Sequence, residues 1–172
     1  MNKLGIVITD GVGFRNFILS DFIQESINTF DEVVIFSCLP KKVYQNLDLK
    51  CKIIELEVFQ ETFKTWFFRK AKEVTHLQLN VIDNFGIQDN LATTYTRNNT
   101  PRGFATRLLH RFSKVLNSER IIQNYNSLQQ ATFRNNSITK EYLSLFTEEN
   151  INLLLFTHQR PPYIAPLILA SK

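Results

Sequence analysis

The sequence predicts an α/β fold, in which helices flank a Rossmann-like parallel sheet of strand order about 3-2-1-4. Three short runs of aliphatic and β-branched residues alternate with helical patterns before Phe59, and a fourth run follows a long helical stretch. Because these runs are mainly apolar, both faces of the sheet are expected to be covered. Buried strands separated by helices are typical of parallel pairing with right-handed crossovers.

The first elements form a βαβαβ unit. The turn pair Asp10-Gly11 ends the first strand, and Pro40 opens a short helix after the second strand. The apolar residues of the first helix spread around more than one stripe, which favours a helix covered on two sides. Strands are expected over residues 3–9, 32–37 and 52–58, and helices over residues 14–30 and 40–47.

A largely helical insertion is predicted over residues 59–150, between strands three and four. The polar segment 88–100, rich in Asn and Thr, is expected to be a mobile loop, and Thr100-Pro101 is a typical helix start. Helices are expected over residues 59–73, 74–87, 101–116, 118–134 and 142–146, the fourth strand over 151–157 and a last helix over 163–171.

The composition is that of a folded globular domain. Its 172 residues allow a single domain, and 44 % hydrophobic with 21 % charged residues exclude the disordered and collagen-like classes. Two cysteines, Cys38 and Cys51, fit neither a zinc site nor a secreted disulfide framework, which indicates a reducing, cytoplasmic compartment. No apolar run approaches the roughly 20 residues of a membrane span.

The extent of the protein is predicted from its last helix. Residues 163–171 have neither a glycine stop nor the following strand of a doubly wound fold. We therefore expect residues 1–172 to form one Rossmann-like domain that is the amino-terminal half of a two-domain protein.

The first candidate site is the loop between the first strand and the first helix. Gly11 and Gly13 can turn the backbone tightly and direct N–H groups at an anion, with Arg15 beside them. A dinucleotide fingerprint is incomplete, because Asn16 takes the third glycine position and no acidic residue closes the second strand. The alternative is a plain turn without a ligand.

The second candidate site is the loop after the fourth strand. With the predicted strand order, this loop faces the first one, which brings Asp10 near His158. His158 can then act as a general base whose tautomer the Asp10 carboxylate holds, while Gln159 and Arg160 bind substrate or phosphate. The alternative is that Asp10 only caps a helix and that Pro161 and Pro162 only shape the start of the last helix. No metal site is expected, since the other histidines are isolated.

A basic helical stretch spans residues 102–120. Arg107, Arg111 and Lys114 fall on one helix face, which can meet an anionic membrane surface or an acidic acceptor. Aromatic residues do not interleave at nucleotide spacing, so nucleic acid is not expected as a partner. The alternative is an ordinary solvated basic face.

Three stretches resemble one family: ITDGVGFRNF (residues 8–17), DEVVIFSCLP (residues 31–40) and FTHQRPPYIAPLILASK (residues 156–172). They are similar to the amino-terminal half of bacterial two-domain glycosyltransferase-like proteins of the GT-B architecture. The resemblance covers essentially the whole chain and is vague across its helical middle. It implies two Rossmann-like domains facing each other across a cleft, the first holding the acceptor and the second binding the nucleotide-sugar donor.

The resemblance also implies roles for the two loops, which would line the cleft. His158 or Asp10 would take the proton of an acceptor hydroxyl, while Arg15, Arg160 and the amides of Gly11 and Gly13 would stabilise negative charge. No cofactor is expected on this chain alone, because the sequence contains no donor-binding half. The implied partners are a carbohydrate acceptor and a donor-binding domain in cis or trans.

The sequence therefore favours the acceptor-binding half of a glycosyltransferase acting on surface polysaccharide or a related acceptor. The alternative is a non-catalytic Rossmann-like module that binds a phosphorylated small molecule or docks a separate catalytic chain. The expected location is cytoplasmic, with peripheral contact to an anionic membrane through the basic helix.

Overall fold

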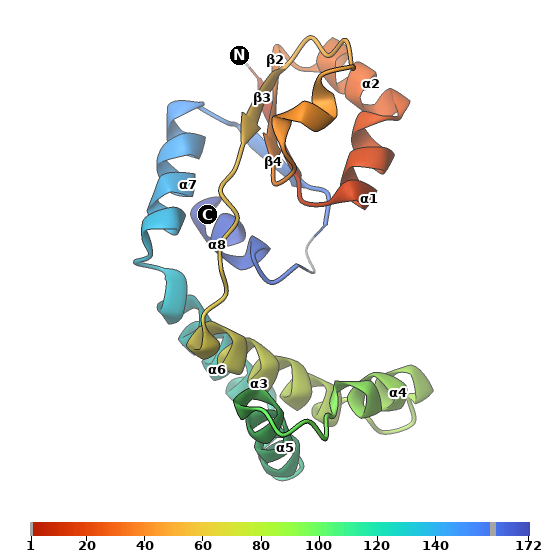
Figure 1. Cartoon of the computed structure of the whole chain (residues 1–172), viewed down its shortest axis with the longest axis vertical. Helices are drawn as coiled ribbons and strands as arrows, with labels where there is room; N and C mark the ends of the chain where they lie inside the picture. The colour runs from red at the N-terminus through yellow and green to blue at the C-terminus, as the bar shows by residue number, and fades with distance from the viewer. Residues whose placement is uncertain (1, 159–160) are drawn as a thin grey trace. The chain divides into compact units, whose positions relative to one another are not determined.

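The computed structural model describes residues 2–158 and 161–172. The chain divides into two compact units: unit 1 comprises Met1–Gln60 and Asn136–Lys172, and unit 2 comprises Glu61–Asn135. Unit 1 contains the strands of the sheet and unit 2 is helical (Figure 1).

The sheet of unit 1 is parallel, with strand order β3-β2-β1-β4, as the sequence predicts. Central β1 pairs with β2 on one side and with β4 on the other, so that Ile6 lies between Ile35 and Leu155. The strands are β1 (Lys3–Ile8), β2 (Glu32–Ser37), β3 (Lys52–Glu55) and β4 (Leu153–Phe156).

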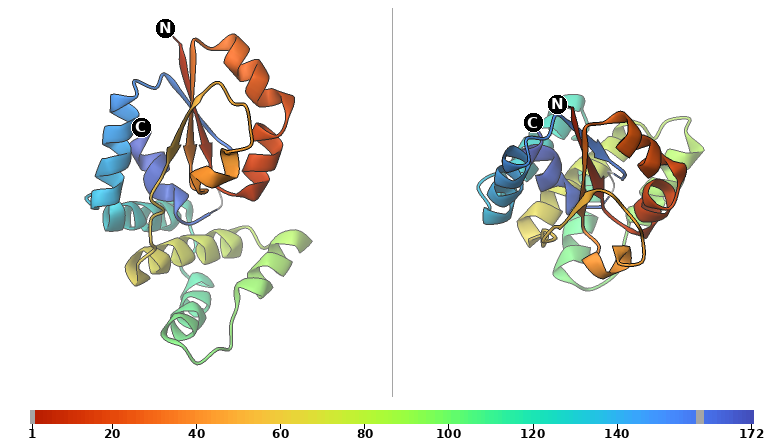
Figure 2. Two further views of the ribbon diagram at one scale, coloured as in Figure 1. Left: turned by 45° about the horizontal axis from the view of Figure 1, so that its top comes forward. Right: turned by 90° about the horizontal axis from the view of Figure 1, so that it is seen from above.

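Helices cover both faces of this sheet, which explains why its central strands are apolar over most of their length. Leu4, Ile6 and Ile8 of β1 form one core with residues of the helices that follow β1. On the other face lie α7 (Ser137–Glu148) and α8 (Ile164–Ala170), as Figure 2 shows. There, Phe146 meets Phe36 edge to face at 5.0 Å between ring centroids.

The helix predicted over residues 14–30 is interrupted. The structure has a short α1 (Gly11–Gly13), a π-helical turn η1 (Phe14–Ile18) and α2 (Asp21–Thr29). The interruption follows from Ser20, whose hydroxyl donates to the Asn16 carbonyl and accepts from the Phe22 N–H. A serine that caps a new helix start offers the backbone an alternative to helix continuation. The short helix after β2 is a single 3₁₀ turn, η2 (Lys41–Tyr44).

Each helix of unit 2 starts with a side-chain cap. The capping residues, Thr62, Asn84, Thr100 and Ser118, each accept from the backbone N–H three positions further on. The predicted start at Thr100-Pro101 is confirmed. The helices are α3 (Phe63–Leu79), α4 (Phe85–Thr94), α5 (Pro101–Ser113) and α6 (Glu119–Phe133).

The expected loop over residues 88–100 is wrong in its first half, because α4 continues to Thr94. Its polar residues are accommodated by local bonds. The hydroxyls of Thr93 and Thr94 donate to helix carbonyls three residues earlier, and Asn84 caps the first turn. The polar composition that suggested a loop is therefore compatible with an exposed helix.

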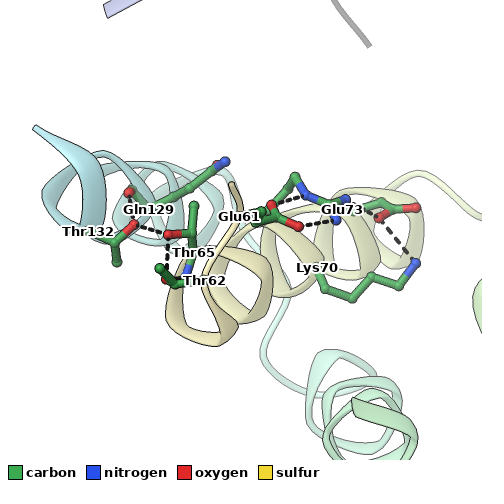
Figure 3. A network of polar contacts seen from close by, with 8 residues as sticks. Glu61, Thr62, Thr65, Lys70, Glu73, Gln129 and Thr132 are labelled. Atoms are coloured by element: carbon green, nitrogen blue, oxygen red, sulfur yellow. Dashed lines mark hydrogen bonds and ion pairs between the residues drawn. The ribbon is translucent and has the colours of Figure 1, made fainter. Parts of the chain in front are cut away.

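Polar contacts join α3 to α6 within unit 2 (Figure 3). The hydroxyls of Thr65 and Thr132 lie 2.8 Å apart, and the Thr132 hydroxyl also donates to the Gln129 carbonyl. Beside them, Arg69 makes a bidentate pair with Glu61 at 2.7 and 3.0 Å. This pairing raises the pKa of Arg69 and fixes the segment that enters α3.

Candidate functional site

The candidate site lies at the carboxyl ends of β1 and β4, where the chain leaves two neighbouring strands on opposite faces of the sheet. In open α/β sheets, ligands bind at such a switch point. Thr9 and Asp10 follow β1, and Thr157 and His158 follow β4. The Thr157 hydroxyl donates to the Val7 carbonyl at 2.9 Å and thereby holds the second loop against the first strand.

Gly13 explains how the two loops approach so closely. A Cβ at this position would overlap the side chain of Thr157, whereas a Cβ at Gly11 would meet open space. Neither glycine has a positive φ, so left-handed backbone is not the reason for them. A glycine at position 13 allows the two loops to approach closely, whereas Gly11 has no such steric role.

Asp10 and His158 form the centre of the site. The Asp10 Oδ2 lies 2.6 Å from His158 Nδ1, while Oδ1 accepts from the backbone N–H groups of Val12 and Gly13 at 3.0 and 2.8 Å. One carboxylate therefore caps α1 and holds the imidazole at the same time. The His158 side chain is 39 % exposed and that of Asp10 is 28 % exposed, so a substrate can reach the pair.

The electrostatics of the pair determine its chemistry. The hydrogen bond from His158, together with those from the Gly13 and Val12 amides, lowers the pKa of Asp10 against the opposing effect of burial. Asp10 is thus a carboxylate at neutral pH and only accepts hydrogen bonds. His158 Nδ1 must then carry the shared proton. In the neutral ring, Nε2 is left as the basic nitrogen, which is the arrangement of a general base with an orienting carboxylate.

Two further side chains border the pair. Cys38 follows β2, where its N–H donates to the Ile8 carbonyl, and burial together with the charge of Asp10 raises its pKa to about 11. Tyr163, at the start of α8, donates from its hydroxyl to the Thr9 carbonyl at 2.7 Å. Burial, Cys38 and Asp10 raise the pKa of Tyr163, which keeps this donor protonated.

Thr9 contributes a buried hydroxyl beside Asp10. Its side chain is 2 % exposed, and its Oγ1 has no hydrogen-bond partner among residues 2–158 and 161–172. Buried hydroxyls are nearly always paired with protein or water. Because Thr9 is buried, its hydroxyl lies beneath the surface that Asp10 and His158 present and is not a direct contact for a bound molecule.

The remaining predicted site residues are placed as follows. Of the two amides expected to face an anion, those of Gly11 and Gly13, the Gly13 amide donates to Asp10, as does the neighbouring amide of Val12. Arg15 is exposed, and its Nε donates to Asn16 Oδ1. Gln159 and Arg160 lie outside the described residues.

Sequence reasoning did not select Thr9, Cys38 and Tyr163 as site residues. The signal for them is positional, since each stands at or shortly after the carboxyl end of a strand of one parallel sheet. Thr9 directly follows β1, and Cys38 directly follows β2. A polar residue at that edge is a candidate whatever its type.

Within residues 2–158 and 161–172, no three His, Cys, Asp or Glu side chains gather closely enough to bind a metal ion. Among the helices that the structure describes, none is both long and apolar enough to span a membrane.

Comparison of the chain with protein-family models, curated proteins and solved structures finds no match in any of the three. The function of the protein must therefore be inferred from the chemistry of the Asp10–His158 pair and its surroundings.

Proposed function

We propose that this chain binds the acceptor of a glycosyl transfer reaction and that His158 is its general base. The observation that carries the proposal is the pairing of His158 Nδ1 with an ionised Asp10 at the switch point of the sheet. This pairing leaves Nε2 to accept the proton of a hydroxyl group. The resemblance of the same two loops to GT-B glycosyltransferases supports a sugar hydroxyl as that group.

The proposed reaction is a displacement at the anomeric carbon of a nucleotide sugar. The acceptor O–H proton moves to His158 Nε2, the acceptor oxygen bonds to the anomeric carbon, and the bond from that carbon to the diphosphate breaks. Asp10 stabilises the imidazolium that forms, as a carboxylate held by its own hydrogen bonds does. A donor-binding domain, in cis or in trans, supplies the nucleotide sugar, and Arg15 is proposed to stabilise negative charge near the acceptor.

The Cys38 thiol, beside the Asp10–His158 pair, is not suited to act as a nucleophile. A reactive cysteine needs a lowered pKa, whereas Cys38 has a pKa raised to about 11. The carboxylate of Asp10 opposes formation of the thiolate. The pair is therefore proposed to act on a substrate hydroxyl directly.

The alternative, a module that binds a phosphorylated small molecule, has less support. The Val12 and Gly13 amides already donate to Asp10. A phosphate at this helix start would have to displace a carboxylate of lowered pKa, and it would be repelled by it.

The proposal is tested by assembling the chain with a donor-binding polypeptide and measuring nucleotide release from a panel of nucleotide sugars in the presence of saccharide acceptors. His158→Gln should lower transfer by about 10²–10⁴-fold, the usual contribution of a general base. Asp10→Asn, which can still cap α1, should lower it less. His76→Gln, at an exposed histidine of α3, is the matched control and should leave transfer unchanged.

Full transfer by the His158→Gln variant would contradict the proposal. Inorganic phosphate, added to the chain alone, tests the alternative: a rise in melting temperature that grows further in Asp10→Asn would favour the phosphate-binding module.

A further inference from the structure

The exposed side of α5 carries an apolar stripe that the core of unit 2 does not use. Phe104, Leu108 and Phe112 recur every four residues and are 59, 36 and 56 % exposed. The stripe continues beyond the helix with Val115 and Leu116, which are 84 and 52 % exposed. Large apolar side chains gathered in this way on a surface mark an interaction site.

Cations lie directly beside this apolar stripe. Arg107, Arg111 and Lys114 follow one another at helical spacing, and no Asp or Glu occurs between Asp89 and Glu119. The guanidinium of Arg107 donates to the backbone carbonyls of residues 96 and 98, which are neutral. The positive charge of this face is therefore not compensated by neighbouring acidic side chains of the same segment.

The rest of α5 is anchored. Ala105, Leu109 and Ser113, each one position after a residue of the apolar stripe, are buried. The ring of His110 packs edge to face on Tyr95, and its Nε2 lies 3.0 Å from the Thr94 hydroxyl. The apolar stripe and the cations are thus presented by a helix whose orientation within unit 2 is already set.

A cavity of about 610 Å³ opens between these groups. It is lined by aromatic, aliphatic and cationic side chains together: Tyr95, Phe104, Arg107, Leu108, His110, Arg111 and Lys114. Cations at the edge of an apolar groove are suited to hold an anionic group whose attached chain is apolar.

We propose that this face of α5, defined by the apolar stripe 104–116 and the cations Arg107, Arg111 and Lys114, binds an anionic lipid bilayer. The apolar side chains enter the boundary between headgroups and acyl chains, and the cations contact lipid phosphates. A nucleic acid would use the cations and leave exposed Phe112 and Val115 without a partner. The inference stands on α5 alone and does not depend on the Asp10–His158 chemistry.

The test is co-sedimentation of the full chain with vesicles of phosphatidylcholine alone and with vesicles that also contain phosphatidylglycerol. We expect binding to the mixed vesicles, weakened by salt, and little binding to the neutral ones. Arg111→Gln with Lys114→Gln should lower the partition coefficient about tenfold or more. Phe112→Ser with Val115→Ser should lower it by a similar factor, because apolar insertion is lost.

Matched controls separate this face from general charge and hydrophobicity. Lys64→Gln with Lys140→Gln removes two exposed cations elsewhere, and Val43→Ser with Leu143→Ser removes two exposed apolar side chains elsewhere. Both controls should bind as the parent chain does, and circular dichroism should show that all variants are folded.

The proposal is overturned if the parent chain shows no preference for anionic vesicles, or if the controls lose binding as strongly as the α5 variants. It is also overturned if the chain forms a dimer that the Phe112→Ser/Val115→Ser variant abolishes, because a second copy then covers the face.

Discussion

Gly13 of α1 lies so close to Thr157, just after β4, that a Cβ at position 13 would overlap the Thr157 hydroxyl oxygen. Gly13→Ala should therefore destabilise the chain by about 1–3 kcal/mol, the usual effect of overpacking. Gly11→Ala is the control, since its Cβ would meet open space and alanine is favoured over glycine in a helix by up to about 1 kcal/mol. Urea unfolding of the two variants measures the difference.

The same contact can be tested by a double-mutant cycle. Thr157→Ala removes the oxygen that the new Cβ would overlap, at the expense of its bond to Val7. The two substitutions together should therefore destabilise less than the sum of the single changes. Strict additivity would show that Thr157 is not what limits position 13.

A second prediction concerns the protonation of His158. Because Asp10 is ionised and accepts from Nδ1, the neutral imidazole should be the Nδ1–H tautomer. Long-range ¹H–¹⁵N spectra of the side chain should show an unprotonated Nε2. In Asp10→Asn this preference should weaken, whereas His76 should be unchanged. A dominant Nε2–H form in the parent chain would contradict the proposed base.

A third prediction concerns acid stability. Glu149, which follows α7, pairs with Lys52 of β3 at 2.6 Å and with Lys3 of β1 at 3.3 Å. These bonds lower the pKa of Glu149 below its value in the unfolded chain. A carboxyl group whose pKa is lower in the folded chain stabilises the fold at pH values above its pKa in the unfolded chain. This contribution is lost as the pH falls through its pKa in the folded chain.

Glu149→Gln should consequently lower the melting temperature near neutral pH, and the gap to the parent chain should close as the solution is acidified. Glu148→Gln is the control, because this neighbouring acid accepts from the Ser144 hydroxyl and makes no ion pair within the part of the chain that the structure describes. A gap that does not change with pH would assign the effect to packing.

A fourth prediction concerns the thiols. Burial raises the pKa of Cys51, and burial with the Asp10 charge raises that of Cys38 to about 11. At about pH 8 the thiolate fraction of folded Cys38 is then on the order of a hundredfold below that of the unfolded chain. Alkylation followed by mass spectrometry should be slow for the folded chain and fast in denaturant. Rapid labelling of Cys38 in the folded chain would contradict the placement of its side chain.

The strand order could be predicted because it depends on coarse features. Mainly apolar runs imply strands covered on both faces, and the right-handed crossover rule then leaves few strand orders. That order in turn brings the loops after β1 and β4 together, and so Asp10 and His158 were expected to be neighbours. The hydrogen bond between them depends on topology more than on any local motif.

The details that the sequence did not reveal depend on single side-chain contacts. The break at Ser20 needs the hydroxyl bond to Asn16, and the helical form of α4 needs local bonds from Thr93 and Thr94. The sequence alone indicates turn geometry as the reason for a glycine at position 13. The structure shows a steric reason instead, because Thr157, far along the chain, lies where a Cβ would be. Long-range contacts of this kind leave no periodic trace in the sequence.

Unit 1 is made of two separate segments of the chain, because β1 pairs with β4 and all of unit 2 lies between these two strands in the sequence. During synthesis, β1, β2 and β3 emerge first, and one edge of β1 stays unpaired until β4 has been made. The helices of unit 2, which form one continuous segment of the chain, can pack against one another meanwhile. The Asp10–His158 site is thus completed last, and a ribosome-bound chain that ends before β4 should lack it entirely.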